Sequence, residues 1–157
     1  MGINPVSIDG SEGPMGDLLD AFQYLQGENL AATSSLADQS QLSAIELRML
    51  LIIRRMPAVS TTTVAGMIHH SIKSCTAIVN RLAMNGYLER QPPLVGGGGP
   101  QLHLTGEGKA LTEGIRDFYR TAFTRAVPEA DLAALAMEVR DLADAIRAKR
   151  MQFEEQS

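Results

Sequence analysis

The sequence lacks the features that mark several large classes of protein. It holds one cysteine among 157 residues, Cys75, which excludes an internal disulfide framework and is typical of a reducing cytosol. No apolar run is long enough to span a bilayer, so no membrane partner is expected. The first residues, Met1 to Ser11, have neither a basic stretch nor an apolar core. We therefore expect no secretory signal and a cytoplasmic protein.

The motifs of common enzymes are also missing. The chain has no P-loop and no dinucleotide fingerprint, and its Ser, His and Asp residues fall at no motif spacing. We therefore expect no catalytic residues, no metal, no cofactor and a protein that is not an enzyme. A repurposed catalytic cleft stays open as an alternative, because a helical cleft can host chemistry without a sequence signature.

Positive charge is scarce overall but is concentrated in the middle of the chain. The net charge is −4, and the first 42 residues hold six acids and no Lys or Arg. Residues 43–105 hold six bases and two acids, a local net charge of +4. Nucleic-acid affinity follows the charge that faces the phosphates rather than the total. The middle segment is therefore the candidate nucleic-acid interface, although +4 is a small charge for that role.

The N-terminal third predicts an arm followed by a helix. Residues 1–14 are rich in Gly, Ser and Pro, which predicts a flexible arm. From Met15 onward, apolar residues recur at helical spacing. Gly27 and the cluster 33–35 (Thr-Ser-Ser) weaken that pattern, so we expect the helix to bend or break there.

The middle segment predicts three helices and a hairpin. Ser43 and Glu46 form a capping box at the start of a helix that ends before Pro57, and a short helix covers 60–68. Ser71 is a natural N-cap for a helix that Gly86 stops. Strands are predicted at 87–91 and 101–104, with a Pro/Gly-rich turn between them. Two more helices are predicted, at 105–126 and from 128 to about 153.

These elements carry an ordered set of motifs, which resembles the MarR (multiple antibiotic resistance regulator) family. The motifs are Leu42-Ser43, Val64-Ala65 with Ile68, Ser71, Val79-Asn80-Arg81-Leu82, Gly86-Tyr87-Leu88-Glu89-Arg90 and Leu104-Thr105-Gly106-Glu107-Gly108. The spacing from Arg90 to Leu104 also matches the family, and the likeness covers the chain beyond residue 14.

The resemblance implies a mainly α fold with a small β-hairpin wing. Residues 15–157 would form a single domain, with a winged helix-turn-helix at 42–105. Dimerisation helices at 15–41 and 106–157 would flank it. The family implies a homodimer on a pseudo-palindromic double-stranded DNA operator, and commonly a small-molecule effector. Two units about one helical turn apart are also what half-site geometry demands.

The candidate DNA-binding residues lie on and just after the second helix of this motif. They are Ser71, Lys73, Ser74, Thr76, Ala77, Asn80, Arg81 and Arg90. Hydroxyls and Lys73 can contact phosphates or bases, whereas Ala77 can touch only a thymine methyl group. The family commonly has an arginine or another polar residue at that position. Arg81 is expected to pair with phosphate or with Glu89 rather than to read bases, and a solvated helix face is the alternative for the whole set.

The wing departs from the family. The resemblance places an Asp near position 96 and an Arg near position 98, where the Arg enters the minor groove. This chain has Gly96, Gly97, Gly98 and Gly99, and residues 94–102 carry no charge. Three interpretations stay open. Operator binding is weakened or lost, or the wing backbone still meets phosphates, or the glycine run was engineered.

Other residues are candidates for sensing. Arg54, Arg55, His69 and His70 form a candidate effector cleft. The arginines alternatively only solvate a helix C-terminus, and the histidines are candidates for zinc, pH or ligand contacts. Cys75 is expected to be a buried structural thiol, with a redox sensor as the alternative.

The sequence thus predicts a homodimeric, DNA-binding transcriptional regulator of MarR type that responds to a small molecule. The alternative is a MarR-like dimer that has lost operator binding and instead binds a ligand or a protein, or catalyses a reaction. The neutral wing, Ala77 and the acidic first 42 residues favour that alternative.

Overall fold

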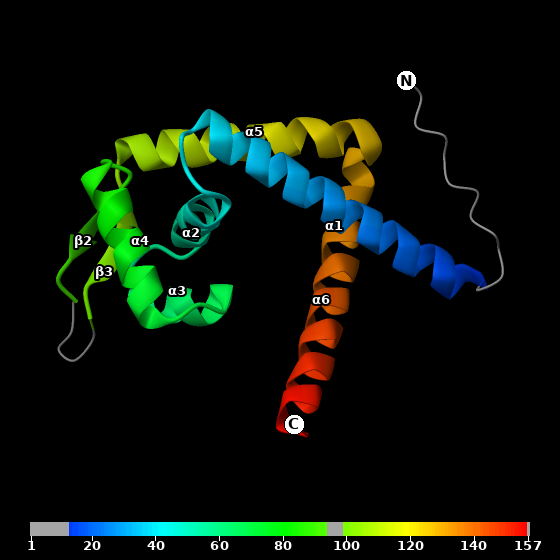
Figure 1. The fold of residues 1–157 in the computed structure, drawn as a ribbon. Helices are drawn as coiled ribbons and strands as arrows, with labels where there is room; N and C mark the ends of the chain where they lie inside the picture. The colour runs from blue at the N-terminus through cyan, green and yellow to red at the C-terminus, as the bar shows by residue number, and fades with distance from the viewer. Residues whose placement is uncertain (1–12, 94–98, 157) are drawn as a thin grey trace. The chain divides into compact units, whose positions relative to one another are not determined.

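The computed structural model describes residues 13–93 and 99–156, and these are mainly helical (Figure 1). The elements in chain order are α1 (Gly13–Gln39), α2 (Ala44–Arg55), β1 (Val59–Ser60), α3 (Thr61–Ile68), α4 (Ile72–Met84), β2 (Leu88–Gln91), β3 (Gln101–Leu104), α5 (Gly106–Ala126), the 3₁₀ turn η1 (Glu129–Asp131) and α6 (Leu132–Glu155).

Contacts divide the chain into two compact units, one ending at Thr112 and the other beginning at Glu113. The first unit holds the predicted winged helix-turn-helix. Helices α2, α3 and α4 lie against a three-stranded antiparallel sheet of order β1-β3-β2. In the register of β2 and β3, Leu88 lies opposite Leu104 and Glu89 opposite His103. The core of this unit is apolar, and its most buried side chains are Leu47, Met49, Leu50, Ile53, Val64, Val79, Leu82 and Leu102.

Serine caps begin the three helices of this unit. The Ser43 hydroxyl accepts from the Glu46 backbone N–H and the Glu46 carboxylate accepts from the Ser43 backbone N–H, so the predicted capping box is confirmed. Ser60 and Ser71 cap α3 and α4 in the same way. Gly86 follows α4 with φ +78°, a left-handed conformation that glycine adopts without strain. The local signals in the sequence therefore set these helix ends.

The observed secondary structure differs from the prediction in α1 and by one additional strand, β1. Helix α1 runs without a break through Gly27 and residues 33–35, and it already includes residues 13 and 14 of the predicted arm. The Thr33 hydroxyl donates to the Asn29 carbonyl at 2.8 Å, so this residue is satisfied inside the helix. The strand β1 was not predicted, because two residues are too few to show an alternating pattern. The first 12 residues of the arm lie outside the described residues.

The junction between β3 and α5 explains the motif at 104–108. The Thr105 hydroxyl donates to the Gly86 carbonyl at 2.6 Å and accepts from the Gly108 N–H at 3.1 Å. A Cβ at Gly108 would lie 2.0 Å from the Tyr87 carbonyl oxygen. Glycine at 108 therefore lets the first turn of α5 approach the backbone that enters β2.

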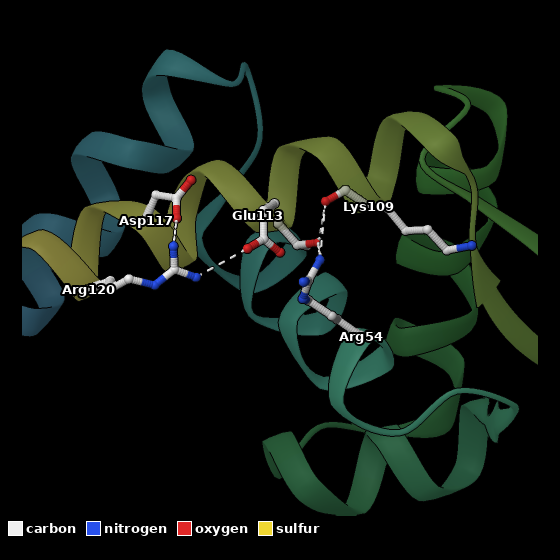
Figure 2. Close-up of polar contacts among 6 residues, drawn as sticks. Arg54, Lys109, Glu113, Asp117 and Arg120 are labelled. Carbon is white, nitrogen blue, oxygen red and sulfur yellow. Dashed lines mark hydrogen bonds and ion pairs between the residues drawn. The ribbon is translucent and has the colours of Figure 1, made fainter. Parts of the chain in front are cut away.

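The second unit contains the rest of α5, η1 and α6. At its start, Arg120 forms ion pairs with Asp117 and with Glu113 (Figure 2). Helix α6 has no buried residue within the chain, and its exposed large apolar residues are Leu135, Met137, Val139, Leu142, Ile146, Met151 and Phe153. Over the described ranges, no helix combines the length and the apolar character needed to cross a membrane.

Candidate nucleic-acid interface

Helix α4 presents one face to the core and one to solvent. Cys75, Val79 and Leu82 are buried against the rest of the unit. The exposed residues include all of the α4 candidates for DNA contact, namely Lys73, Ser74, Thr76, Ala77, Asn80 and Arg81, together with the N-cap Ser71. The helix is therefore held by its apolar face, and its polar and methyl-bearing face is accessible.

Arg81 is held by a residue of α2. Its Nε donates to Glu46 Oε1 at 2.5 Å, and the other Glu46 oxygen accepts from the backbone N–H and hydroxyl of Ser43 at 2.8 and 2.7 Å. Burial of Glu46 opposes ionisation, but the hydrogen bonds from Arg81 and Ser43 outweigh it and lower the pKa of this carboxyl. The expected internal partner of Arg81 was Glu89, and the observed partner is Glu46. The ion pair ties the last turn of α4 to the first turn of α2.

Arg90 in β2 contacts α4 as well. Its Nη2 donates to Oδ1 of Asn80, and both residues are exposed. The contact orients the Asn80 side-chain amide. Its oxygen faces β2 and accepts from Arg90, and its NH₂ group remains a donor. Two of the candidate residues thus form one polar cluster between helix and sheet.

The hydroxyls at the start of α4 are used within the helix. Ser71 Oγ accepts from the Ser74 backbone N–H at 3.1 Å and donates to Ser74 Oγ at 2.8 Å. Thr76 Oγ1 donates to the Ile72 carbonyl at 2.8 Å. These hydroxyls therefore cap or stabilise the helix in the protein without DNA.

The wing residues Gly96, Gly97 and Gly98 lie outside the described residues. Gly99 is described and exposed. The nearest charged or ionisable residue before the wing glycines is Arg90 in β2, and the nearest one after them is His103 in β3.

Cys75 is completely buried, and burial raises the pKa of its thiol. A thiol of raised pKa without solvent contact is a poor nucleophile. This observation favours the structural interpretation of Cys75 over the redox sensor.

A pocket of about 490 Å³ lies on the first unit, where the end of α2 meets the sheet and the start of α5. Arg54 borders it, and its Nη1 donates to the Lys109 carbonyl at 3.2 Å and to Thr112 Oγ1 at 3.1 Å (Figure 2). Gln91 Nε2 donates to Glu89 Oε1 at 2.9 Å on the same rim. The lining residues are Ile53, Arg54, Pro57, Glu89, Gln91, His103, Leu104 and Lys109.

Of the four residues of the candidate effector cleft, only Arg54 lines this pocket. Arg55 is exposed at the end of α2. His69 is the C-cap of α3 with φ 57°, and Nδ1 of His70 lies 3.0 Å from the Ile68 carbonyl. Both histidines therefore have roles in the turn between α3 and α4. In the described part of the chain, no group of three metal-ligating side chains is brought together.

Sequence reasoning did not select the residues that line the pocket beside Arg54. His103, Lys109 and Gln91 come from three different elements, and no local pattern joins them. His103 Nε2 is buried, and within the described residues it has no hydrogen-bond partner. The one sequence signal for this pocket is His103, a single histidine in a strand of alternating polar and apolar residues.

The three-helix arrangement, the serine-capped α4 and the β2–β3 hairpin define a winged helix-turn-helix unit. No protein-family model matches the sequence, and no curated protein matches it either. Solved structures do match.

One is a MarR family protein from Bacillus stearothermophilus, with 10% identity and a TM-score of 0.67 over 87% of this chain and 95% of that one. Streptococcus pneumoniae FabT in complex with DNA has 17% identity and a TM-score of 0.64, over 83% of this chain and 98% of FabT. Staphylococcus aureus MarR in complex with salicylate and kanamycin has 13% identity and a TM-score of 0.64, over 85% and 91%. The protein thus has the fold of MarR-family winged-helix proteins, which confirms the predicted fold class and the resemblance at the level of the fold.

Proposed function

We propose that this protein is a cytoplasmic, homodimeric transcriptional regulator of MarR type that binds double-stranded DNA and responds to a small molecule. The observation that carries the proposal is the exposed face of α4 on a winged helix-turn-helix, next to the cation of Arg90. In this motif the second helix enters the major groove, and basic side chains that flank the helix contact phosphates. We assign Lys73 and Arg90 to phosphate contacts, and the exposed α4 residues Ile72, Thr76, Ala77 and Asn80 to base contacts.

The homodimer is supported by unpartnered apolar surface. Helix α6 carries seven exposed large apolar residues, and α1 carries Leu18, Leu19, Tyr24, Leu25 and Leu30 in exposed positions. Helices that expose this many large apolar side chains are uncommon on a monomer and mark an interaction site. A second copy of the chain is the proposed partner, because operator half-sites require two identical reading units.

The pocket next to α2 and β3 supports the small-molecule response. It has room for a small ligand, and its lining mixes cations, an anion and apolar atoms. Because Glu89 and Gln91 flank Arg90 in β2, a ligand here would contact the strand that holds Arg90 beside Asn80. The S. aureus neighbour, whose structure contains salicylate and kanamycin, is a precedent for small molecules on this fold.

Selection from randomised duplex DNA tests the proposal. The purified dimer is incubated with the pool at about 50 and about 200 mM salt, and the bound duplexes are sequenced. We expect a palindromic motif whose binding weakens steeply with salt. Failure to enrich any duplex with a folded dimer overturns the proposal.

The second candidate is a dimer of the same fold that has lost operator binding. It is favoured by the absence of charge over 94–102 and by the internal ion pair of Arg81, which leaves few cations for phosphates. The double substitution Gly96→Asp with Gly98→Arg discriminates between the two. If it creates DNA binding that the parent lacks, the parent is the second candidate, and the pocket becomes the site to probe for ligands.

A further inference from the structure

The exposed face of α4 carries methyl groups beside its polar groups. Ile72 is 53% exposed in the first turn of the helix, and Thr76 and Ala77 are exposed one turn later. Residues four apart lie on the same face of a helix, so Ile72, Thr76 and Asn80 form one stripe. The stripe spans eight residue steps, or about 12 Å, which matches three to four base-pair steps of about 3.4 Å.

The hydrogen bonds of α4 decide what this stripe offers to a base. The proton of the Thr76 hydroxyl is donated to the Ile72 carbonyl. What Thr76 offers a partner is therefore its methyl group and an oxygen that accepts. Ala77 adds a second methyl group, and Ile72 adds an apolar side chain that is half exposed.

Asn80 completes the stripe as a donor. Bidentate reading of adenine by asparagine uses both the amide oxygen and the NH₂ group. Here one of the two acceptor sites on that oxygen is taken by Arg90, whose guanidinium comes from β2, and the NH₂ group is the donor that the amide offers. The NH₂ group can only donate, so we assign it to a hydrogen-bond acceptor such as O4 of thymine.

Thymine is the base that matches both a methyl-bearing surface and a hydrogen-bond donor. In the major groove it presents its C5 methyl group beside the O4 acceptor, whereas cytosine presents a donor and no methyl group. We infer that α4 selects thymine, with Ile72, Thr76 and Ala77 contacting C5 methyl groups and Asn80 donating to O4. Each half-site would then contain a run of A·T pairs under α4. This inference rests on the proposed function, because it names the base chemistry that the same site reads.

Deoxyuridine in place of thymidine tests the inference, because it removes the methyl group and keeps the base pair. Each thymidine of the selected half-site is replaced in turn, and the affinity is measured by fluorescence anisotropy. At a contacted position we expect about fourfold weaker binding, the value for losing one methyl-sized apolar contact. Equal affinity for thymidine and deoxyuridine at every position overturns the inference while the proposed function stands.

Two variants assign the effect to residues. Thr76→Ser removes only the methyl group and keeps the hydroxyl that bonds the Ile72 carbonyl. Ile72→Ala shortens the exposed apolar side chain. Each variant should lose the preference for thymidine over deoxyuridine at one position. Combining each protein variant with each DNA substitution gives a double-mutant cycle that measures this coupling.

The matched control is Thr124→Ser in α5. Thr124 is exposed, and its hydroxyl donates to the carbonyl of Arg120, four residues earlier, at 2.9 Å. It thus copies the local chemistry of Thr76 outside α4, and its substitution should leave the thymidine preference unchanged. A selected motif rich in G·C under α4, or a loss of preference in the control alone, contradicts the inference. If no duplex is selected at all, the proposed function fails and the inference fails with it.

Discussion

Removing Arg81 should destabilise the protein through Glu46 rather than through any exposed contact. The Glu46 side chain is 5% exposed, and Arg81 Nε lies 2.5 Å from its Oε1. In Arg81→Ala this carboxylate oxygen stays buried without its cation. An unsatisfied buried group costs about 1–3 kcal/mol, and the side chain of Arg81 is 58% exposed, so water reaches part of the site. We therefore expect a loss of about 1–2 kcal/mol in the free energy of unfolding, less than the about 3–5 kcal/mol lost when a fully buried ion pair is broken.

The pH dependence separates this mechanism from simple loss of packing. In the parent the pKa of Glu46 is lowered from 4.5, so its ionised form stabilises the fold above that pH. The stabilisation is lost as the pH falls through the lowered pKa. In the variant, burial persists without the cation, and the pKa of Glu46 rises. The stability difference between parent and variant should therefore be largest at neutral pH and shrink below pH 4.5.

Urea unfolding monitored by circular dichroism, at one fixed protomer concentration, measures both effects. The control is Arg48→Ala, which removes an exposed arginine from α2. If Arg81→Ala and Arg48→Ala agree within about 0.5 kcal/mol at neutral pH, the role assigned to the Glu46–Arg81 pair is wrong.

Three further predictions concern packing, reactivity and charge. Gly108→Ala should cost about 2–4 kcal/mol, because its Cβ would lie 2.0 Å from the Tyr87 carbonyl oxygen. By contrast Gly66→Ala, with no atom within 4 Å of the added Cβ, should stabilise α3 by up to about 1 kcal/mol; equal melting temperatures would contradict this. Cys75 should resist alkylation by iodoacetamide at pH 8 in the native protein and react in urea, since burial raises the pKa of its thiol; rapid native labelling would contradict it. With two phosphate contacts per protomer, from Lys73 and Arg90, the affinity of the dimer for its operator should fall about 150-fold between 50 and 200 mM salt, and a flat salt titration would refute that assignment.

The sequence predicted the winged helix-turn-helix well because its signals are local. The Ser43–Glu46 capping box, the N-cap Ser71 and the terminating Gly86 each act within four residues of a helix end, and all three are observed. The apolar spacing of Cys75, Val79 and Leu82 likewise identified the buried face of α4.

Predictions failed where residues that disfavour a helix were stabilised within it, and where the partner of an ion pair was distant in sequence. The polar cluster at 33–35 was expected to interrupt α1, but the Thr33 hydroxyl bonds the Asn29 carbonyl within the helix. Glu46 was recognised as a capping residue, yet its ion pair with Arg81 joins residues 35 positions apart. No pattern within a single helix reports such a pair.

The sequence by itself therefore determined where α2, α3 and α4 begin and end, which face of α4 is buried, and that the chain resembles this fold. These properties depend on residues within about one or two turns of each other, so they can be read along the chain. Only the tertiary structure decided that Glu46 holds Arg81, that Arg90 orients Asn80, and that Gly108 must admit the Tyr87 carbonyl. Each of these contacts arises because packing brings together elements that are distant in sequence, and the atoms that meet are set by the geometry of the packed helices and sheet.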